Sequence, residues 1–277
     1  MDSPSIEDER PYLRPEPSSL PWVLGSVALA LAAGIGYYYY SSQRPAKVSA
    51  PAVAAKPEPA PQAPTPPAIL NPLPQAGSAS LPTLENSDSM MREAMAKLFG
   101  RNAFENLLVA DRLIPRIVAT VDSLPRRTAP QRMMPLHAVP GGFRANGGEH
   151  ATLDPSNASR YAPYLRMVEA VPASALVALY VQAYPLFQAA YEQLGFGGRY
   201  FNDRLVEAID DLLAAPEVSA PIRLLRPKVL YEFADPDLET RSAGQKILIR
   251  IGTDNARKVK AKLRELRQEL AAAATRR

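Results

Sequence analysis

The segment GGRYFNDRLVEAIDDLL, residues 197–213, combines carboxylates and arginines at helical spacing. Two carboxylates can share acid and base catalysis when burial raises the pKa of one of them above that of the other. A helix over this segment instead separates the charges from an apolar stripe, which consists of Leu205, Ile209, Leu212 and Leu213. We therefore expect the charged face to be solvated or to bind a partner, and we predict no catalytic residue on it.

A second set of charges lies in the lysine- and arginine-rich helix predicted for residues 254–277. Its apolar residues recur at heptad-like spacing and form a narrow seam of Val259, Leu263, Leu266 and Leu270. The seam either docks on the rest of the domain, or the helix serves in binding, with its bases as a surface for anionic lipid or its seam as the site of a partner helix. A helix-turn-helix around Gly252 is less favoured, because Lys258 falls where that motif has an apolar residue.

The candidate partner-binding residues are charged side chains of these two helices. They are Arg199, Asp203, Arg204, Glu207, Asp210, Lys258, Lys260, Lys262, Arg264 and Arg267. No catalytic, cofactor-binding or metal-ligating residue is predicted, and we expect no cofactor. His137 and His150 lack the HExxH spacing of a zinc site, and no glycine-rich phosphate-binding motif occurs. The chain has no cysteine, which excludes disulfides, thiol catalysis and thiolate zinc sites.

An aromatic stripe is predicted where Tyr180, Tyr184, Phe187 and Tyr191 follow one another at helical spacing. Such a stripe packs in a hydrophobic core, or it forms a platform on which sugar rings or bases stack. Pro185 interrupts the stripe, and we expect it to bend the helix or to split it in two. Core and binding surface both remain as interpretations of this pattern.

The elements that would position these side chains begin with an apolar segment near the N-terminus. Residues 1–20 predict a disordered tail, and residues 21–41 predict a transmembrane helix. The uncharged run WVLGSVALALAAGIGYYYY would extend ~28 Å as a helix, close to the thickness of a hydrocarbon core. Trp22 and the tyrosines at 37–40 suit the two membrane interfaces. A cleaved signal peptide is the alternative, but residues 1–20 carry more acids than bases.

Residues 42–83 are rich in proline and alanine and predict a disordered tether, since such a composition cannot bury a core. As an extended polyproline chain, about 40 such residues reach on the order of 120 Å. The bases on the two sides of the span are nearly balanced and favour a cytoplasmic C-terminus only slightly. Because similar tethers follow the anchors of envelope-spanning bacterial proteins, we instead predict a bacterial inner-membrane protein with a periplasmic C-terminal domain.

Residues 84–277 predict one multi-helix globular domain, so the fold class is mainly α with at most a small β-hairpin or two. One hairpin would turn at Asn146-Gly147, and two further strands would flank Arg226-Pro227. Pro115 lies inside a helical pattern, and we expect the helix to kink or to restart there.

Three segments occur in a fixed order behind the single span: RIVATVDSLPRR, YFNDRLVEAIDDLL and SAGQKILIRIG. In this arrangement the chain resembles a bacterial family, domain of unknown function number three-thousand-and-fourteen, mostly from proteobacterial membrane-anchored proteins. The resemblance covers roughly residues 84–270, essentially the whole predicted domain. It implies the architecture given above and brings no catalytic or ligand-binding residue, because none is established for the family.

We therefore expect a membrane-anchored interaction or scaffold protein of the cell envelope rather than an enzyme. Its expected partners are the membrane and an envelope protein or cell-wall component, with anionic lipid as a further ligand of the last helix. One alternative is an envelope enzyme such as a glycan hydrolase, which would need a buried carboxyl group facing a cleft. The other is a membrane-tethered cytoplasmic regulator whose basic last helix binds nucleic acid, a less favoured partner.

Overall fold

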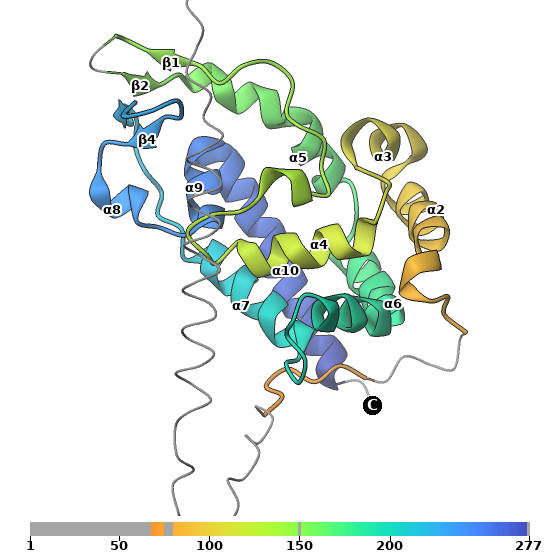
Figure 1. The fold of residues 1–277 in the computed structure, drawn as a ribbon. Helices are drawn as coiled ribbons and strands as arrows, with labels where there is room; N and C mark the ends of the chain where they lie inside the picture. The colour runs from red at the N-terminus through yellow and green to blue at the C-terminus, as the bar shows by residue number, and fades with distance from the viewer. Residues whose placement is uncertain (1–67, 75–79, 149–150, 276–277) are drawn as a thin grey trace, which may run out of the picture. The chain divides into compact units, whose positions relative to one another are not determined.

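The computed structural model describes residues 68–74, 80–148 and 151–275, and most of these residues are helical (Figure 1). The prediction of a mainly α fold with small β-hairpins is therefore confirmed. The predicted tail, the predicted span and most of the tether lie outside the described residues.

No single helix in the described ranges is long and apolar enough to cross a bilayer. One bent pair, Pro155–Glu169 with Ala173–Gln193, meets the test by length and composition only.

The first three helices are α2 (Asp88–Phe99), α3 (Arg101–Leu107) and α4 (Leu113–Ser123). Pro115 lies in the first turn of α4, where a missing N–H costs no intrahelical hydrogen bond, so the predicted restart is confirmed. Asp88 caps this new start, because its carboxylate accepts the N–H groups of Arg112 at 2.8 Å and of Leu113 at 3.1 Å.

The remaining helices of eight or more residues form most of the domain. They are α5 (Ala162–Glu169), α6 (Ala173–Gln193), α7 (Phe201–Leu213), α9 (Ala243–Arg250) and α10 (Thr253–Thr275). The C-terminal helix α10 packs against α5, α6, α7 and α9, and Figure 1 shows it passing behind α4. Short elements complete the chain: α8 (Pro236–Glu239) and the 3-10 turns Leu84–Asn86, Gln131–Met133 and Pro155–Tyr161.

Helix α6 runs through Pro185 as one element, so the expected split into two helices does not occur. Proline there removes one backbone hydrogen bond, but the turns on both sides of it are buried in the same core, which holds the helix together. Phe187 and Tyr191 are buried, and their ring contacts include a stacked pair of Phe187 with Phe201 at 6.0 Å. Tyr180 and Tyr184 pack against the same cluster. The aromatic stripe is therefore core.

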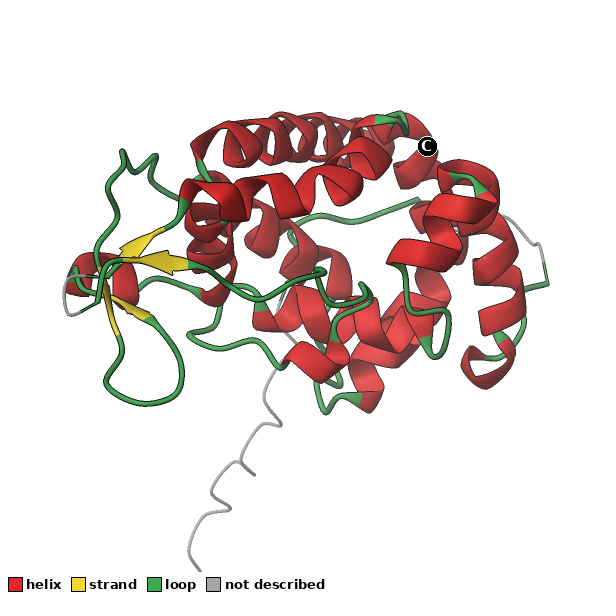
Figure 2. Ribbon diagram, turned by 90° about the horizontal axis from the view of Figure 1, so that it is seen from above, coloured by secondary structure: helices red, strands yellow, loops and turns green. Residues whose placement is uncertain are grey.

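Two antiparallel hairpins lie together at one end of the domain (Figure 2). The first pairs β1 (Ala145–Asn146) with β2 (Thr152–Leu153), and the second pairs β3 (Leu224–Leu225) with β4 (Glu232–Phe233). A bridge between Thr152 and Arg223 joins the two hairpins. Both predicted hairpins occur, but the first does not turn at Asn146-Gly147, because Asn146 pairs with Thr152 and the turn follows it. Their small core contains Leu224, Phe233 and Ile249.

Helices α7 and α9 approach each other closely through a glycine. A Cβ atom on Gly244 would stand 2.6 Å from Cδ2 of Leu212 and 3.3 Å from the carbonyl oxygen of Leu124. A larger residue would therefore require the Leu212 side chain to move and would crowd the Leu124 carbonyl.

Candidate functional site

The charged face of α7 contains a buried ion pair. Arg204 donates from Nε to Oδ1 of Asp122 on α4 at 3.1 Å, and it also donates to the Asp122 main-chain carbonyl. The two side chains are only 14% and 12% exposed. Arg126 donates to the other carboxylate oxygen of Asp122 at 2.7 Å. Arg204 therefore joins α7 to α4, and little of its side chain is exposed.

The pKa of Arg204 reflects this pairing. Burial alone would lower it, but the hydrogen bond to Glu207 and the charges of Glu207 and Asp122 raise the pKa above its usual value. Glu207 itself is exposed and lies 2.7 Å from the Arg204 guanidinium. Within this network Glu207 is the carboxylate that solvent reaches.

Asp203 holds the segment of chain that precedes the domain. Its carboxylate accepts the main-chain N–H groups of Leu70 at 3.1 Å and of Asn71 at 2.7 Å. The buried Asn202 donates to the Asn71 carbonyl at 2.9 Å, and the Tyr200 hydroxyl accepts the N–H of Leu73 at 3.0 Å. We name residues 68–74 with these partners the docked segment. It was not predicted from the sequence.

Other charges of α7 also face neighbouring helices. Asp210 is half-exposed and pairs with Arg267 of α10 at 3.2 Å. Asp211 accepts hydrogen bonds from Ser242 at 2.6 Å and from the amide of Gln245, both at the start of α9. Arg199 lies in the exposed loop before α7, over the ring of Phe196 at 5.9 Å.

Two lysines of the predicted basic surface on α10 are buried. Lys260 is 6% exposed, and its ammonium group donates to the carbonyl of Ala215 just beyond α7. Lys262 is 9% exposed and donates to the Val171 carbonyl just beyond α5 at 3.1 Å, with Glu265 at 2.7 Å. Cations suit the carbonyl-rich ends of helices. These lysines fasten α10 to two helix ends.

The other bases of α10 are more exposed. Lys258 lies 3.4 Å from Glu169 with its side chain about half exposed, and Arg264 is exposed. The apolar seam of α10 packs on the domain, because Leu263, Leu266 and Leu270 belong to one cluster with α6 and α7 and Val259 packs in a neighbouring one. The seam therefore packs within the domain, which was the first interpretation of its sequence pattern.

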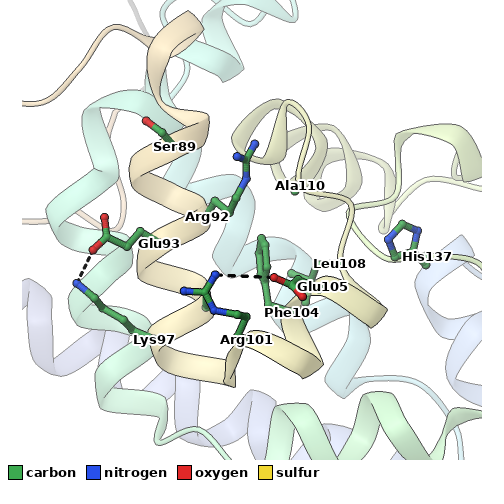
Figure 3. A pocket seen from close by; sticks show the side chains of 11 residues that line it. Ser89, Arg92, Glu93, Lys97, Arg101, Phe104, Glu105, Leu108, Ala110 and His137 are labelled. Atoms are coloured by element: carbon green, nitrogen blue, oxygen red, sulfur yellow. Dashed lines mark ion pairs between the residues drawn. The ribbon is translucent and has the colours of Figure 1, made fainter.

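A groove of about 550 Å³ lies beside α2 and α3 and extends to the loop that carries His137 (Figure 3). Each acid at the groove has a base beside it: Glu93 pairs with Lys97 at 2.8 Å and Glu105 with Arg101 at 3.9 Å. His137 is exposed and is held through its main chain, since its N–H donates to Leu107 and its carbonyl accepts from Tyr164. His150 lies outside the described residues. These are features of a solvated surface.

Carboxyl groups with a shifted pKa bear on the enzyme alternative. In the described residues five such groups occur, and the pKa is lowered in each: Glu85, Glu93, Asp154, Glu217 and Glu239. A glycosidase acid needs the opposite shift, so none of these five fits that role. The described ranges also contain no group of three or more His, Asp or Glu side chains placed to hold a metal ion.

The most exposed apolar side chains of the hairpin end lie on the turn between β3 and β4. Val229 is 78% exposed, Leu230 is 77% exposed and Leu225 is 52% exposed. Arg223, Arg226 and Lys228 lie among them and are also exposed. We name residues 223–232 the basic-apolar hairpin. Sequence reasoning predicted its strands but missed its surface, because no periodicity tells an exposed valine or leucine in a turn from a buried one.

A family model with the description "Protein of unknown function (DUF3014)" matches residues 113–267 of the chain. The match begins at the first residue of α4 and includes the basic-apolar hairpin, whereas the groove beside α2 and α3 lies mostly outside it. No curated protein and no solved structure matches the chain.

Proposed function

The chain belongs to the family of proteins of unknown function DUF3014, and we propose that it is a membrane-anchored interaction protein of the bacterial cell envelope. In this proposal residues 21–41 anchor the chain in the inner membrane. The Pro/Ala-rich tract then carries the helical domain into the periplasm, where the domain binds an envelope or cell-wall partner.

The docked segment is the observation that carries this proposal. It lies within the second half of the Pro/Ala-rich tract, and hydrogen bonds between its main-chain groups and the side chains of Asp203, Asn202 and Tyr200 attach it to the domain. Leu73 also packs on the cluster formed by α6, α7 and α10. A spacer that only separates two parts needs no such attachment.

A fixed exit point has a mechanical consequence for a tethered domain. Because the chain leaves the domain at the N-terminal end of α7, a pull along the tether acts there and not on the hairpins. Figure 1 shows residues 68–74 at the end of the drawn domain opposite β1, β2 and β4. The attachment of the tether therefore leaves the hairpin end free for binding.

The test is a labelling experiment on the full chain, which has no native cysteine. A single Ser78→Cys variant is treated with a membrane-impermeant maleimide in cells whose outer membrane alone has been permeabilised. A Ser5→Cys variant serves as the matched control, because the proposal places the N-terminal tail in the cytoplasm. We expect the chain in the membrane fraction, with the thiol at position 78 labelled and the thiol at position 5 protected.

Two results would contradict the proposal in different ways. Recovery of the chain in the soluble fraction would show that residues 21–41 do not anchor it in the membrane. Protection of position 78 until the inner membrane is lysed would place the domain in the cytoplasm, and the regulator with a nucleic-acid partner would then be favoured.

A further inference from the structure

The basic-apolar hairpin presents aliphatic side chains to solvent that a folded domain would normally bury. Val229 and Leu230 are adjacent and both more than three-quarters exposed, and Leu225 stands on the outward face of β3. Three bases and one acid, Glu232, lie among residues 223–232. Within the described residues, no ion pair joins Arg223, Arg226 or Lys228 to an acid. The surface is thus apolar and cationic together.

The base of this hairpin is firmly held, so its exposure is not that of a loose loop. Leu224 and Phe233 are each 2% exposed and face the hairpin core. Glu239 accepts the Phe233 N–H at 2.9 Å, and Arg250 lies 4.8 Å from the centre of the Phe233 ring. The inward and outward residues alternate as in any half-buried strand pair. The turn is therefore presented by a fixed support.

The turn itself is shaped by its own basic and aromatic residues. The Arg226 guanidinium lies 5.4 Å from the centre of the Tyr231 ring and donates to the Val229 carbonyl at 3.3 Å. Tyr231 also contacts Phe143 at 5.5 Å, beside the first hairpin. Tyrosine rings and long basic side chains favour the interface between lipid headgroups and acyl chains.

The composition of this surface fits a lipid bilayer better than a protein partner. Arginine and tyrosine occur at both kinds of surface, but leucine and valine are under-represented among the residues that dominate protein–protein binding, and lysine is depleted from such interfaces. Aliphatic side chains surrounded by lysine and arginine instead suit a surface where the apolar part enters the acyl region and the bases meet phosphate. A domain tethered to a membrane also meets that surface at high effective concentration.

We infer that the basic-apolar hairpin docks on the surface of an anionic lipid bilayer, with Val229 and Leu230 inserted at the headgroup boundary and Arg223, Arg226 and Lys228 facing lipid phosphates. This inference rests on the proposed function for the nearness of the membrane. It assigns lipid contact to the hairpin, whereas the sequence pattern had assigned it to the last helix.

The experiment places a water-sensitive fluorophore on the turn of the full chain. A Val229→Cys variant is labelled with a nitrobenzoxadiazole dye and reconstituted into nanodiscs that contain either phosphatidylglycerol with phosphatidylcholine or phosphatidylcholine alone. In anionic discs we expect a blue-shifted, brighter emission that nitroxide lipids quench, and in neutral discs we expect emission typical of water. A Leu194→Cys variant is the control, because Leu194 is also exposed but lies in the loop after α6.

The role of the bases is tested in the same labelled chain. Because each lysine or arginine near an anionic surface contributes about fivefold to binding, Arg226→Gln with Lys228→Gln should lower the ratio of docked to free hairpin roughly 25-fold. The matched control is Arg92→Gln with Lys97→Gln on α2, which removes the same charge from another exposed surface and should leave the ratio unchanged.

Three results would overturn the inference. A dye that stays in water in anionic discs shows that the hairpin does not meet lipid, and a protein partner would then be sought. Equal shifts in both lipid compositions, or equal effects of the two double variants, would remove the role of the bases.

Failure of the proposed function gives a separate signal, because a chain without a membrane anchor does not remain with the discs. In that event anionic vesicles added to the labelled chain decide the inference, since a blue shift supports it and an unchanged spectrum rejects it.

Discussion

The ammonium group of Lys260 donates to a carbonyl just beyond α7, whereas Lys228 stands on the exposed turn between β3 and β4. Both residues add one positive charge to the domain, yet of the two only Lys228 presents that charge to solvent. Helix α10 uses two lysines to bind the ends of other helices, and α7 uses Arg204 and Asp203 to bind α4 and the docked segment. In the hairpin, Arg226 contacts only residues of its own turn, and none of the three bases caps a helix or joins two elements within the part of the chain that the structure describes.

The difference shows why a charged helical face is a poor guide to a binding surface. A long side chain on the edge of a helix can turn inward, bury its aliphatic part and cap a neighbouring helix. A short hairpin has too little core to absorb its side chains, so the charges and aliphatic groups on its turn remain outside. Substitutions in the two regions can test this difference between the helix charges and the hairpin charges.

Replacing Arg204 with alanine should lower the free energy of unfolding by about 3 kcal/mol, since it leaves part of a buried carboxylate unpaired. Denaturant titration of the chain measures this change. The matched control is Glu207→Gln, which removes only the exposed partner of Arg204 and should cost about 0–1 kcal/mol. Equal, small effects of the two substitutions would show that the Asp122–Arg204 pair does not stabilise the domain.

Replacing Lys260 with methionine should cost about 1.5 kcal/mol, because the Ala215 carbonyl loses a charged hydrogen-bond donor while the aliphatic packing is kept. Lys258 is half-exposed and lies on nearly the opposite side of the helix, so Lys258→Met should change stability by roughly 0.5 kcal/mol or less. The same denaturant titration applies. If Lys258→Met were the more damaging substitution, the assignment of inward and outward lysines on α10 would be wrong.

Replacing Asp203 with alanine should release the docked segment at a cost of about 1 kcal/mol, since two main-chain N–H groups lose their acceptor. Hydrogen exchange followed by mass spectrometry should show faster exchange in residues 70–73 and unchanged exchange in α4. Asp210→Ala is the comparison, because it also removes an acid from α7 but does not touch this segment. Unchanged exchange at residues 70–73 would contradict the docking.

The support of the hairpin should weaken in acid. Burial raises the pKa of Glu239, but hydrogen bonds from Lys246 and from the Phe233 N–H outweigh it, so its folded pKa lies below the usual 4.5. A lowered folded pKa stabilises the fold above about pH 4.5, and that stabilisation is lost as the pH falls through the folded value. At pH 7 the free energy of unfolding of the wild-type protein should therefore be about 1 kcal/mol larger than that of the Glu239→Gln variant.

The measurement is the difference in unfolding free energy between the two proteins at pH 7 and at pH 3. This difference should shrink at the lower pH, because the carboxyl group of Glu239 is then increasingly protonated. A constant difference across this range would show that the charge of Glu239 does not support the hairpin.

Much of the fold followed from local patterns in the sequence. The restart at Pro115, the turn near Asn146-Gly147 and the strands on either side of Arg226-Pro227 were predicted from backbone chemistry that acts within a few residues. Pro185 shows the limit of such rules, because the core on both sides of it holds α6 together.

The candidate surfaces depended on contacts between distant segments, which periodicity does not encode. The burial of Lys260 and Lys262 required the ends of α7 and α5 to lie beside α10. The partner of Asp203 was 132 residues away, in a tract whose composition predicted a plain tether. The exposed apolar turn of the hairpin had no periodic pattern in the sequence, so its exposure became evident only in the structure.

One measurement tests the contrast between the helix charges and the hairpin charges most directly: the rate at which each lysine of the folded full chain is acetylated, followed by mass spectrometry. Lys228 should react at a rate close to those of the exposed Lys97 and Lys258, whereas Lys260 and Lys262 should react many times more slowly and only when the domain opens. Reaction of Lys260 and Lys262 as fast as Lys228 would show that α10 carries an exposed basic face. The bases of the hairpin would then not differ in exposure from those of the helix.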